Sequence, residues 1–212
     1  LFTNRSNKPS YATPIIGRVG GRPQVLVTGG NQTDAYHPDT GDALWQVKGP
    51  SSVTACTMAF GDEYVYATGG YPQKTLMCID ANEGSADVVW RTTSPGEVTY
   101  VPSPLLHDGR LYVVNDRGNA TCFNATTGDV LWEQQIAGEV TSSPVLANGH
   151  IYVSDEEGRT YIFKPGDTYQ PVAENQLPGA QFATPAFVDN RIYVRTDSRL
   201  YCIANTQAAQ RP

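Results

Sequence analysis

The stretch CFNATTGDVLW at residues 122–132 decides the fold, because a second stretch of the same form, AYHPDTGDALW, stands at residues 35–45. Both begin on a small residue, carry Gly in the seventh position and end on Trp. The pattern belongs to a repeat of about 42 residues, a period typical of propellers and solenoids. One such unit cannot bury its apolar face alone, so it must stack on its neighbours. The chain is therefore expected to be an array of stacked units.

Five copies of the repeat follow one another, and each carries the signals of short strands. One position can be aligned in all five copies. In each copy it is followed by a turn and then by a strand of β-branched and aromatic residues, as at residues 111–114 (LYVV) and 151–153 (IYV). Gly, Asp or Asn precedes four of the five strands, which suits hairpin turns because these residues tolerate positive φ. A third strand, a turn and a fourth strand complete the unit, and four such strands make one propeller blade. The aligned positions are Pro14, Thr57, Pro104, Pro144 and Pro185.

The predicted fold class is therefore all-β: a β-propeller of four-stranded antiparallel blades, forming one domain over residues 1–212. Residues 1–9 are expected to be the outer strand of a preceding or closing blade, because Leu1 and Phe2 precede the first aligned proline at the offset of an outer strand. That strand could close a ring, or the chain could be an arc of a larger propeller with roughly seven or eight blades. We favour the arc, since rings of five blades are less common. The expected repeats span residues 10–51, 52–96, 97–138, 139–179 and 180–204.

The composition agrees with short strands and tight turns. Hydrophobic residues make up 40% of the chain, charged residues only 17%, and there are 20 Gly, 15 Pro and 12 Tyr. The net charge of -6, without any run of Lys and Arg, argues against nucleic acid as a partner. No apolar stretch approaches the roughly 20 residues that span a bilayer, so no transmembrane segment is expected.

The four cysteines are expected to be buried thiols rather than disulfides. Cys78, Cys122 and Cys202 occupy the same place in three different repeats, and Cys56 lies in a different strand. Equivalent positions of separate blades are too far apart for a disulfide, whose Cα atoms lie within about 7 Å. A free Cys in a strand then behaves as a small apolar side chain.

Residues 35–45 and 122–132 resemble the tryptophan-docking repeat of pyrroloquinoline-quinone (PQQ)-like β-propellers, the quinoprotein alcohol dehydrogenase-like superfamily. That repeat has Ala first, Asp third, Gly seventh and Trp last. This chain departs from it at His37 and Asn124, which replace the Asp, and at Cys122, which replaces the Ala.

In the family, the indole reaches the adjoining blade and packs on the peptide at its Gly. The resemblance therefore implies that the tryptophans are stacking residues rather than ligand-binding ones. The fourth repeat has lost its Trp and carries Val172 and Ala173 in its place. The implied inter-blade docking residues are Trp45, Trp90, Trp132, Gly41, Gly84 and Gly128.

The resemblance covers nearly the whole chain and implies more than one function. Some members of the superfamily are dehydrogenases that bind PQQ and Ca²⁺, whereas others, including outer-membrane assembly lipoproteins, keep the blades without the cofactor. The cofactor-binding branch uses a vicinal disulfide, a calcium set of Glu, Asn and Asp, and an Asp base. No Cys-Cys pair occurs in this chain, and we place no such carboxylate set.

We therefore predict a non-enzymatic propeller without a cofactor, acting as a protein-binding or envelope-assembly scaffold that is periplasmic, outer-membrane-associated or secreted. Two alternatives stay open: a fragment of a PQQ- and calcium-dependent alcohol or sugar dehydrogenase, and the sensor domain of a larger receptor. Whether the chain is an enzyme is left undecided, with quinoprotein dehydrogenase as the enzymatic alternative.

Residues with metal or catalytic potential have simpler interpretations. The acidic run at residues 155–157 fits a solvated hairpin, because the same turn position recurs in other repeats with different chemistry. His37, His107 and His150 share no ligand spacing. No phosphate-binding Gly loop or nucleophile motif is present. We predict no catalytic, cofactor-binding or metal-binding residue.

A partner is expected on one rim of the propeller, where loops of successive blades converge. The loops that lead into the innermost strands share that face with the loops between second and third strands. Glu97 and Glu139 occupy matching positions in two repeats. A repeated loop on one face suits an extended protein partner. The predicted partner-binding residues are Glu97, Glu139, Gln181 and Tyr71.

Overall fold

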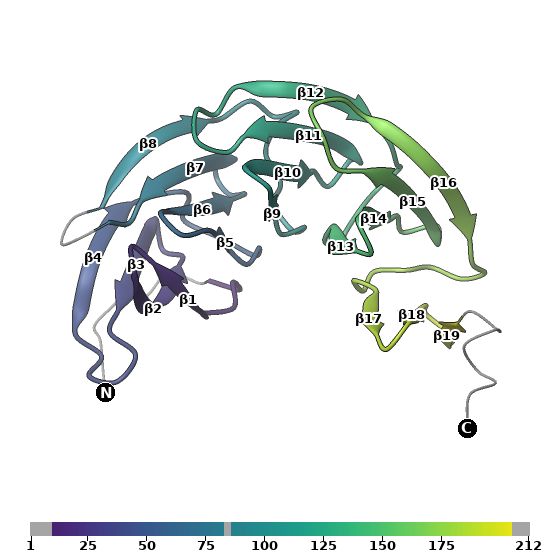
Figure 1. Cartoon of the computed structure of the whole chain (residues 1–212), viewed down its shortest axis with the longest axis horizontal. Helices are drawn as coiled ribbons and strands as arrows, with labels where there is room; N and C mark the ends of the chain where they lie inside the picture. The colour runs from purple at the N-terminus through teal and green to yellow at the C-terminus, as the bar shows by residue number, and fades with distance from the viewer. Residues whose placement is uncertain (1–9, 83–85, 205–212) are drawn as a thin grey trace.

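The computed structural model describes residues 10–82 and 86–204, and all regular elements in these ranges are β-strands. They form five antiparallel sheets, four of four strands and one of three, in which each strand pairs with the next along the chain. Figure 1 shows these sheets as the blades of an open arc. The predicted all-β propeller of four-stranded antiparallel blades is thus confirmed. The outer strand predicted in residues 1–9 lies outside the described residues.

The sheets follow one another in chain order. The first contains β1 (Ile15–Val19), β2 (Arg22–Thr28), β3 (Gln32–Tyr36) and β4 (Ala43–Lys48). The second contains β5 (Ala59–Phe60), β6 (Tyr64–Gly69), β7 (Thr75–Asp80) and β8 (Asp87–Thr92). The third contains β9 (Leu105–His107), β10 (Arg110–Val114), β11 (Asn119–Asn124) and β12 (Val130–Gln135). The fourth contains β13 (Val145–Ala147), β14 (His150–Ser154), β15 (Arg159–Lys164) and β16 (Gln170–Gln176), and the fifth β17 (Ala186–Val188), β18 (Arg191–Arg195) and β19 (Leu200–Ala204).

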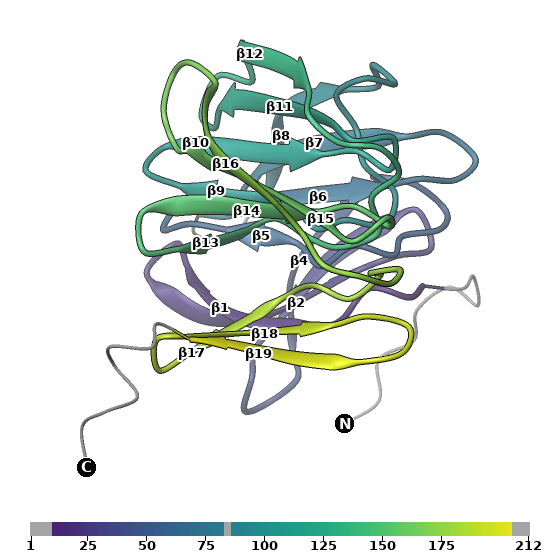
Figure 2. The same ribbon diagram turned by 90° about the vertical axis from the view of Figure 1, so that its right-hand side faces the viewer.

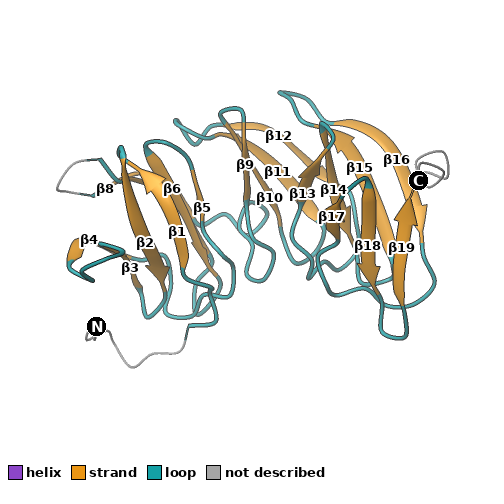
Figure 3. Ribbon diagram, turned by 60° about the horizontal axis from the view of Figure 1, so that its bottom comes forward, coloured by secondary structure: helices purple, strands orange, loops and turns teal. Residues whose placement is uncertain are grey.

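Each sheet stands on edge in the arc. The first strands of the sheets, β1, β5, β9, β13 and β17, face its inside, and β4, β8, β12 and β16 form its outer border (Figure 1). Turned by 90°, the same ribbon shows the strands running across the view, with their connecting loops at the two sides (Figure 2). The loops therefore gather at the two ends of the strands, on two opposite faces of the arc (Figure 3).

The hairpins between first and second strands have the backbone that their residues predict. Asp108 and Gly109 both have positive φ, at 48° and 69°, and Asn148 and Gly149 repeat the pair at 48° and 72°. Two successive positive φ values define the tight turn whose twist matches that of the flanking strands. The hairpin prediction is confirmed at both turns.

A β-bulge at one fixed place gives the sheets a common register. The pairing of the third and fourth strands shifts after Ala35, Cys78, Cys122 and Ile162 in the first four sheets. Such a bulge re-aims the neighbouring side chains. Directly before the shift, these residues pair with the outer-strand positions Trp45, Trp90, Trp132 and Ala173.

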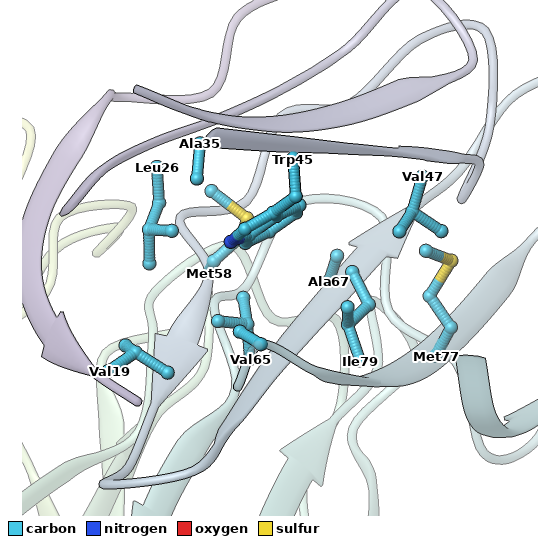
Figure 4. Packing of buried hydrophobic residues seen from close by; sticks show 11 residues of the cluster. Val19, Leu26, Ala35, Trp45, Val47, Met58, Val65, Ala67, Met77 and Ile79 are labelled. Carbon is cyan, nitrogen blue, oxygen red and sulfur yellow. The ribbon is translucent and has the colours of Figure 1, made fainter. Parts of the chain in front are cut away.

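The core is divided among the interfaces between neighbouring sheets. In the first interface, Leu26 and Trp45 from the first sheet pack with Val65, Met77 and Ile79 from the second (Figure 4). A second cluster joins the second and third sheets, and a third joins the third and fourth. Each pair of neighbours thus buries its own apolar surface, as expected of a stacked array.

The cysteines follow the prediction with one exception. All four are free, and Cys56, Cys78 and Cys122 are buried. The expectation of burial is wrong for Cys202, which is exposed. Its equivalent Cys122 is covered by the fourth sheet, as a member of the third cluster. In the described part of the chain, no further sheet covers the corresponding side of the fifth.

We expect only one of the four thiols to react quickly with Ellman's reagent at pH 8. Burial raises the pKa of Cys56, Cys78 and Cys122 to about 12, and a protonated, inaccessible thiol does not attack the reagent. Cys202 should react at once, and the other three only after unfolding in guanidinium chloride. A second fast-reacting thiol in the folded protein would contradict the burial of Cys56, Cys78 and Cys122.

Candidate functional site

One face of the arc carries a continuous row of loops, which we call the rim (Figure 3). It contains the loops that connect one sheet with the next and the turns between second and third strands. Hydrogen bonds join these two kinds of loop. The connecting loops are residues 49–58, 93–104, 136–144 and 177–185, and the turns are residues 29–31, 70–74, 115–118, 155–158 and 196–199.

Backbone hydrogen bonds hold the connecting loops at residues 136–144 and 177–185 against the sheets that they leave. The N–H groups of Ile136 and Ala137 both donate to the carbonyl oxygen of Gly118, at 3.0 and 3.2 Å. In the next repeat, the N–H of Leu177 donates to the carbonyl oxygen of Gly158 at 3.0 Å. The loop therefore crosses directly over the turn of its own sheet.

The same loops are also bonded to the turn of the following sheet. The Val140 N–H donates to the Asp116 carbonyl at 3.0 Å, while the carbonyl of Glu139 accepts from the Glu156 N–H at 2.9 Å. Residues 115–118 and 155–158 belong to successive sheets, so the loop bridges them. A row of loops fixed at both sides presents its side chains on a rigid support, which lowers the entropy lost on binding.

Glycine is required where the loops cross the turns. Gly118 and Gly158 have φ of +76° and +85°, a region that favours Gly. A Cβ atom at Gly118 would lie 2.3 Å from the carbonyl oxygens of Ala137 and Gly138. At Gly158 it would lie 2.5 Å from the carbonyl oxygen of Gly179. No side chain fits between the turn and the loop.

A carboxylate strengthens the rim between the second and third sheets. Asp116 accepts the Lys74 ammonium at 2.7 Å and the backbone N–H groups of Tyr100 and Val101 at 3.1 and 3.0 Å. Lys74 lies in the turn of the second sheet and Asp116 in that of the third. The Tyr100 ring also lies against Gly70, because a Cβ there would be 1.8 Å from it. These contacts place Tyr71 and Val101, which adjoin Gly70 and Tyr100, on neighbouring parts of the rim.

The predicted rim residues differ in exposure. Tyr71 is 63% exposed, and Glu139 is also exposed. Glu97 is half-buried, since its Oε2 accepts the Thr92 hydroxyl at 2.6 Å. Tyr71 and Glu139 therefore present their side chains to a partner more fully than Glu97 does.

Gln181 does not present its side chain on the rim, and this residue of the prediction is corrected. Its side chain is fully buried. The Gln181 N–H donates to the Glu156 carbonyl at 3.1 Å, as the Val140 N–H donates to Asp116 one repeat earlier. Gln181 thus corresponds to the buried Val140, and Ala180 corresponds to Glu139. The sequence alignment was one residue out at this loop.

The rim also exposes two apolar side chains that the sequence did not single out. Val101 is 37% exposed and Phe182 is 52% exposed. Each stands two residues before a hydroxyl that accepts a backbone N–H from the preceding connecting loop: Ser103 accepts from Thr57, and Thr184 accepts from Ser143. In the sequence, an apolar residue two positions before this hydroxyl was the signal by which Val101 and Phe182 could have been found.

The indoles of the second and third sheets reach the following sheet. Trp90 Nε1 donates to the Ala125 carbonyl at 3.0 Å, and a Cβ at Gly128 would lie 2.7 Å from its ring. Trp132 Nε1 donates to the Gly166 carbonyl at 3.0 Å. These contacts support the docking interpretation, which a stability measurement can test. Gly84 lies outside the described residues.

Trp45 makes a different hydrogen bond. Its Nε1 donates to Oε1 of Gln24, in its own sheet, at 2.7 Å. The Gln24 amide nitrogen donates to the Val19 carbonyl at 2.8 Å and approaches the Ala81 carbonyl of the second sheet at 3.5 Å. The buried amide therefore stands between the indole and the adjoining sheet. Gly41, the remaining predicted docking residue, has φ of +75° in its turn.

Cysteines and potential metal-ligating side chains lie apart in the described ranges. The cysteines are free and lie in different strands or loops. Residues 10–82 and 86–204 contain no group of three or more His, Cys, Asp or Glu side chains able to hold a metal ion. No helix in those ranges is long and apolar enough to cross a membrane.

Comparisons with known proteins agree with this architecture. The family model of the outer membrane protein assembly factor BamB matches residues 29–105 and 87–208. BamB of Salmonella typhimurium is 24% identical over 209 residues, covering 92% of this chain and 48% of that protein. The beta-alanine-activating enzyme of Danio rerio is 30% identical over 124 residues, 54% of this chain and 10% of that protein. The chain spans less than half the length of either curated relative.

Among solved structures, BamB from Moraxella catarrhalis aligns with a TM-score of 0.51 and 17% identity, covering 91% of this chain and 71% of that one. A europium-containing methanol dehydrogenase aligns with a TM-score of 0.47 and 16% identity, over 58% of this chain and 24% of that one. At this identity, the likeness to the Moraxella protein shows a common fold.

Proposed function

This chain belongs to the family of the outer membrane protein assembly factor BamB, and from that premise we propose that it is a protein-binding scaffold in outer-membrane protein assembly. It acts there without a cofactor or a catalytic group. Its proposed location is the periplasmic side of the outer membrane. The rim is the surface that holds the partner.

The observation that carries this proposal is the rim itself. It combines a rigid, hydrogen-bonded row of loops with the exposed apolar side chains of Tyr71, Val101 and Phe182. Aromatic and apolar anchors on a rigid support supply most of the energy of a protein interface. Because these anchors come from three different repeats along the arc, they suit an extended polypeptide rather than a compact ligand.

We expect the double variant Tyr71→Ala and Phe182→Ala to lose partner capture by about tenfold or more, because aromatic anchors dominate interface energies. The full-length protein would be immobilised and exposed to solubilised bacterial envelope extract, and bound outer-membrane assembly components quantified. Val188→Ala is the matched control: Val188 is 54% exposed in the hairpin at the opposite ends of the strands. The control should capture as much as the unmodified protein.

Two results would overturn the proposal. Equal capture by the double variant and the control would show that the rim is not the binding surface. PQQ- and Ca²⁺-dependent oxidation of an alcohol or sugar by the full-length protein, followed with an electron-accepting dye, would favour the dehydrogenase alternative.

A further inference from the structure

The interface between the fourth and fifth sheets lacks the indole that the first three interfaces contain. Ala173 pairs with Ile162 in the register in which Trp132 pairs with Cys122 and Trp90 with Cys78. The third and fourth sheets thus have equivalent outer-strand positions, one occupied by an indole and the other by a methyl group.

The residue at the position that receives the indole is buried in the third and fourth sheets and exposed in the fifth. In the second interface, Phe123 stacks on Trp90, with the ring centroids 5.8 Å apart. In the third, Phe163 meets Trp132 edge to face at 5.9 Å. Both phenylalanines are 0% exposed, whereas Ile203, at the same register position of the fifth sheet, is 43% exposed. Ile203 lies in β19, which has no fourth strand beside it in the described residues, and no indole from the fourth sheet covers it.

A cavity of about 350 Å³ remains between the fourth and fifth sheets. No charged side chain is present among the described residues that line it, and the amide of Asn175 and the hydroxyl of Thr160 add polar groups to its wall. It borders a groove of about 710 Å³ with which it shares Tyr152, Phe187 and Ile203. The apolar lining is formed by Ile162, Leu177, Phe187, Ile192, Val194 and Ile203.

We propose that this cavity binds a small, neutral, planar aromatic molecule of the size of indole. Two of its lining residues, Tyr152 and Ile203, stand at the register positions of Tyr112 and Phe163, whose rings contact the Trp132 indole. An uncharged lining favours a neutral ligand, because a buried charge without a partner is costly. The Asn175 side-chain oxygen can accept one N–H or O–H of the ligand. The site does not rest on the proposed function, since it lies between two sheets and needs no protein partner.

The test uses indole itself as the probe and the complete chain as the protein. Isothermal titration is expected to give saturable binding with a Kd of the order of 0.1 to 1 mM, as suits a ligand of so few atoms. In a ¹³C-methyl spectrum, indole should shift the signals of Ile162, Ile192 and Ile203, which line the cavity.

Two variants distinguish this site from general aromatic binding. Ala173→Trp supplies the missing ring in cis and should weaken indole binding at least tenfold. Glu174→Trp is the matched control, because successive residues of a strand face opposite sides and this indole would lie outside the cavity. Glu174 is exposed and paired with Arg159 at 3.5 Å, a surface contact of small energetic weight.

Equal indole affinity in Ala173→Trp and the unmodified chain would overturn the proposal, and so would the absence of binding at several millimolar indole. If Ala173→Trp does not fold, the methyl spectrum of the unmodified chain decides. Shifts confined to methyl groups that line the cavity support the site, and shifts only elsewhere or none at all refute it.

Discussion

Replacing Trp132 with Ala is expected to lower the free energy of unfolding by about 3 kcal/mol, the lower end of the range for aromatic residues truncated to Ala, because the indole is partly buried. The indole contacts the rings of Tyr112, Phe163 and Tyr169, with centroids 6.2, 5.9 and 5.4 Å away. Its N–H also donates to the Gly166 carbonyl of the fourth sheet. The substitution would remove these contacts and leave a cavity between two sheets.

Urea unfolding followed by far-ultraviolet circular dichroism measures this loss without depending on tryptophan fluorescence. Leu131→Ala is the control, because Leu131 precedes Trp132 in the same strand and is 36% exposed. Its cost should stay near 1 kcal/mol or below, as for a partly exposed side chain. If both variants lose the same stability, the indole does not hold the third and fourth sheets together.

Gly118→Ala is expected to cost about 3 kcal/mol or more, well above Gly109→Ala at about 1 kcal/mol. Both glycines have positive φ, +76° and +69°, so the two variants share the backbone strain of Ala in that region. They differ in space: a Cβ at Gly109 meets nothing within 4 Å, whereas at Gly118 it meets two carbonyl oxygens at 2.3 Å. The connecting loop must move away and weaken the hydrogen bonds from Ile136 and Ala137.

The difference between the two variants isolates the contact between turn and loop. Equilibrium urea unfolding gives each free energy, and hydrogen exchange at the Ile136 and Ala137 amides reports whether the loop has moved. Faster exchange at these amides is expected in Gly118→Ala alone. Equal stability of the two variants would mean that the rim loops are not tightly held against the turns.

The fold was predictable because its determinants are local and repeated. The Asp108-Gly109 and Asn148-Gly149 pairs specify their hairpins through residues that adopt positive φ. The stretch at residues 122–132 contains both the bulge and the indole that follows it, so one motif implies the register of the whole blade. Turn residues and repeated motifs of this kind can be recognised in a single sequence.

Contacts between sheets were harder to predict. Gln24 appears in the sequence as an ordinary polar strand residue, yet it is fully buried and accepts the Trp45 indole N–H. The exposure of Cys202 depends on what lies beyond its sheet rather than on its own repeat. Gln181 was misplaced by one residue: the loops at residues 136–144 and 177–185 have equal length, and their hydrogen bonds make Ala180 the equivalent of Glu139. Because exposed and buried positions adjoin in these loops, a shift of one residue exchanges them.

The hydrogen bonds that cross the interfaces give the array a direction. Trp90 and Trp132 donate from one sheet to a carbonyl of the next. The inner loops repeat this order, with the Ser103 N–H donating to Ser143 and the Ser143 N–H to Thr184. The face of a sheet that carries the donors therefore complements the opposite face of another sheet. It does not complement a second copy of itself. Any contact that reuses these surfaces is heterologous: it closes a ring or continues a spiral, and it does not produce a two-fold symmetric pair.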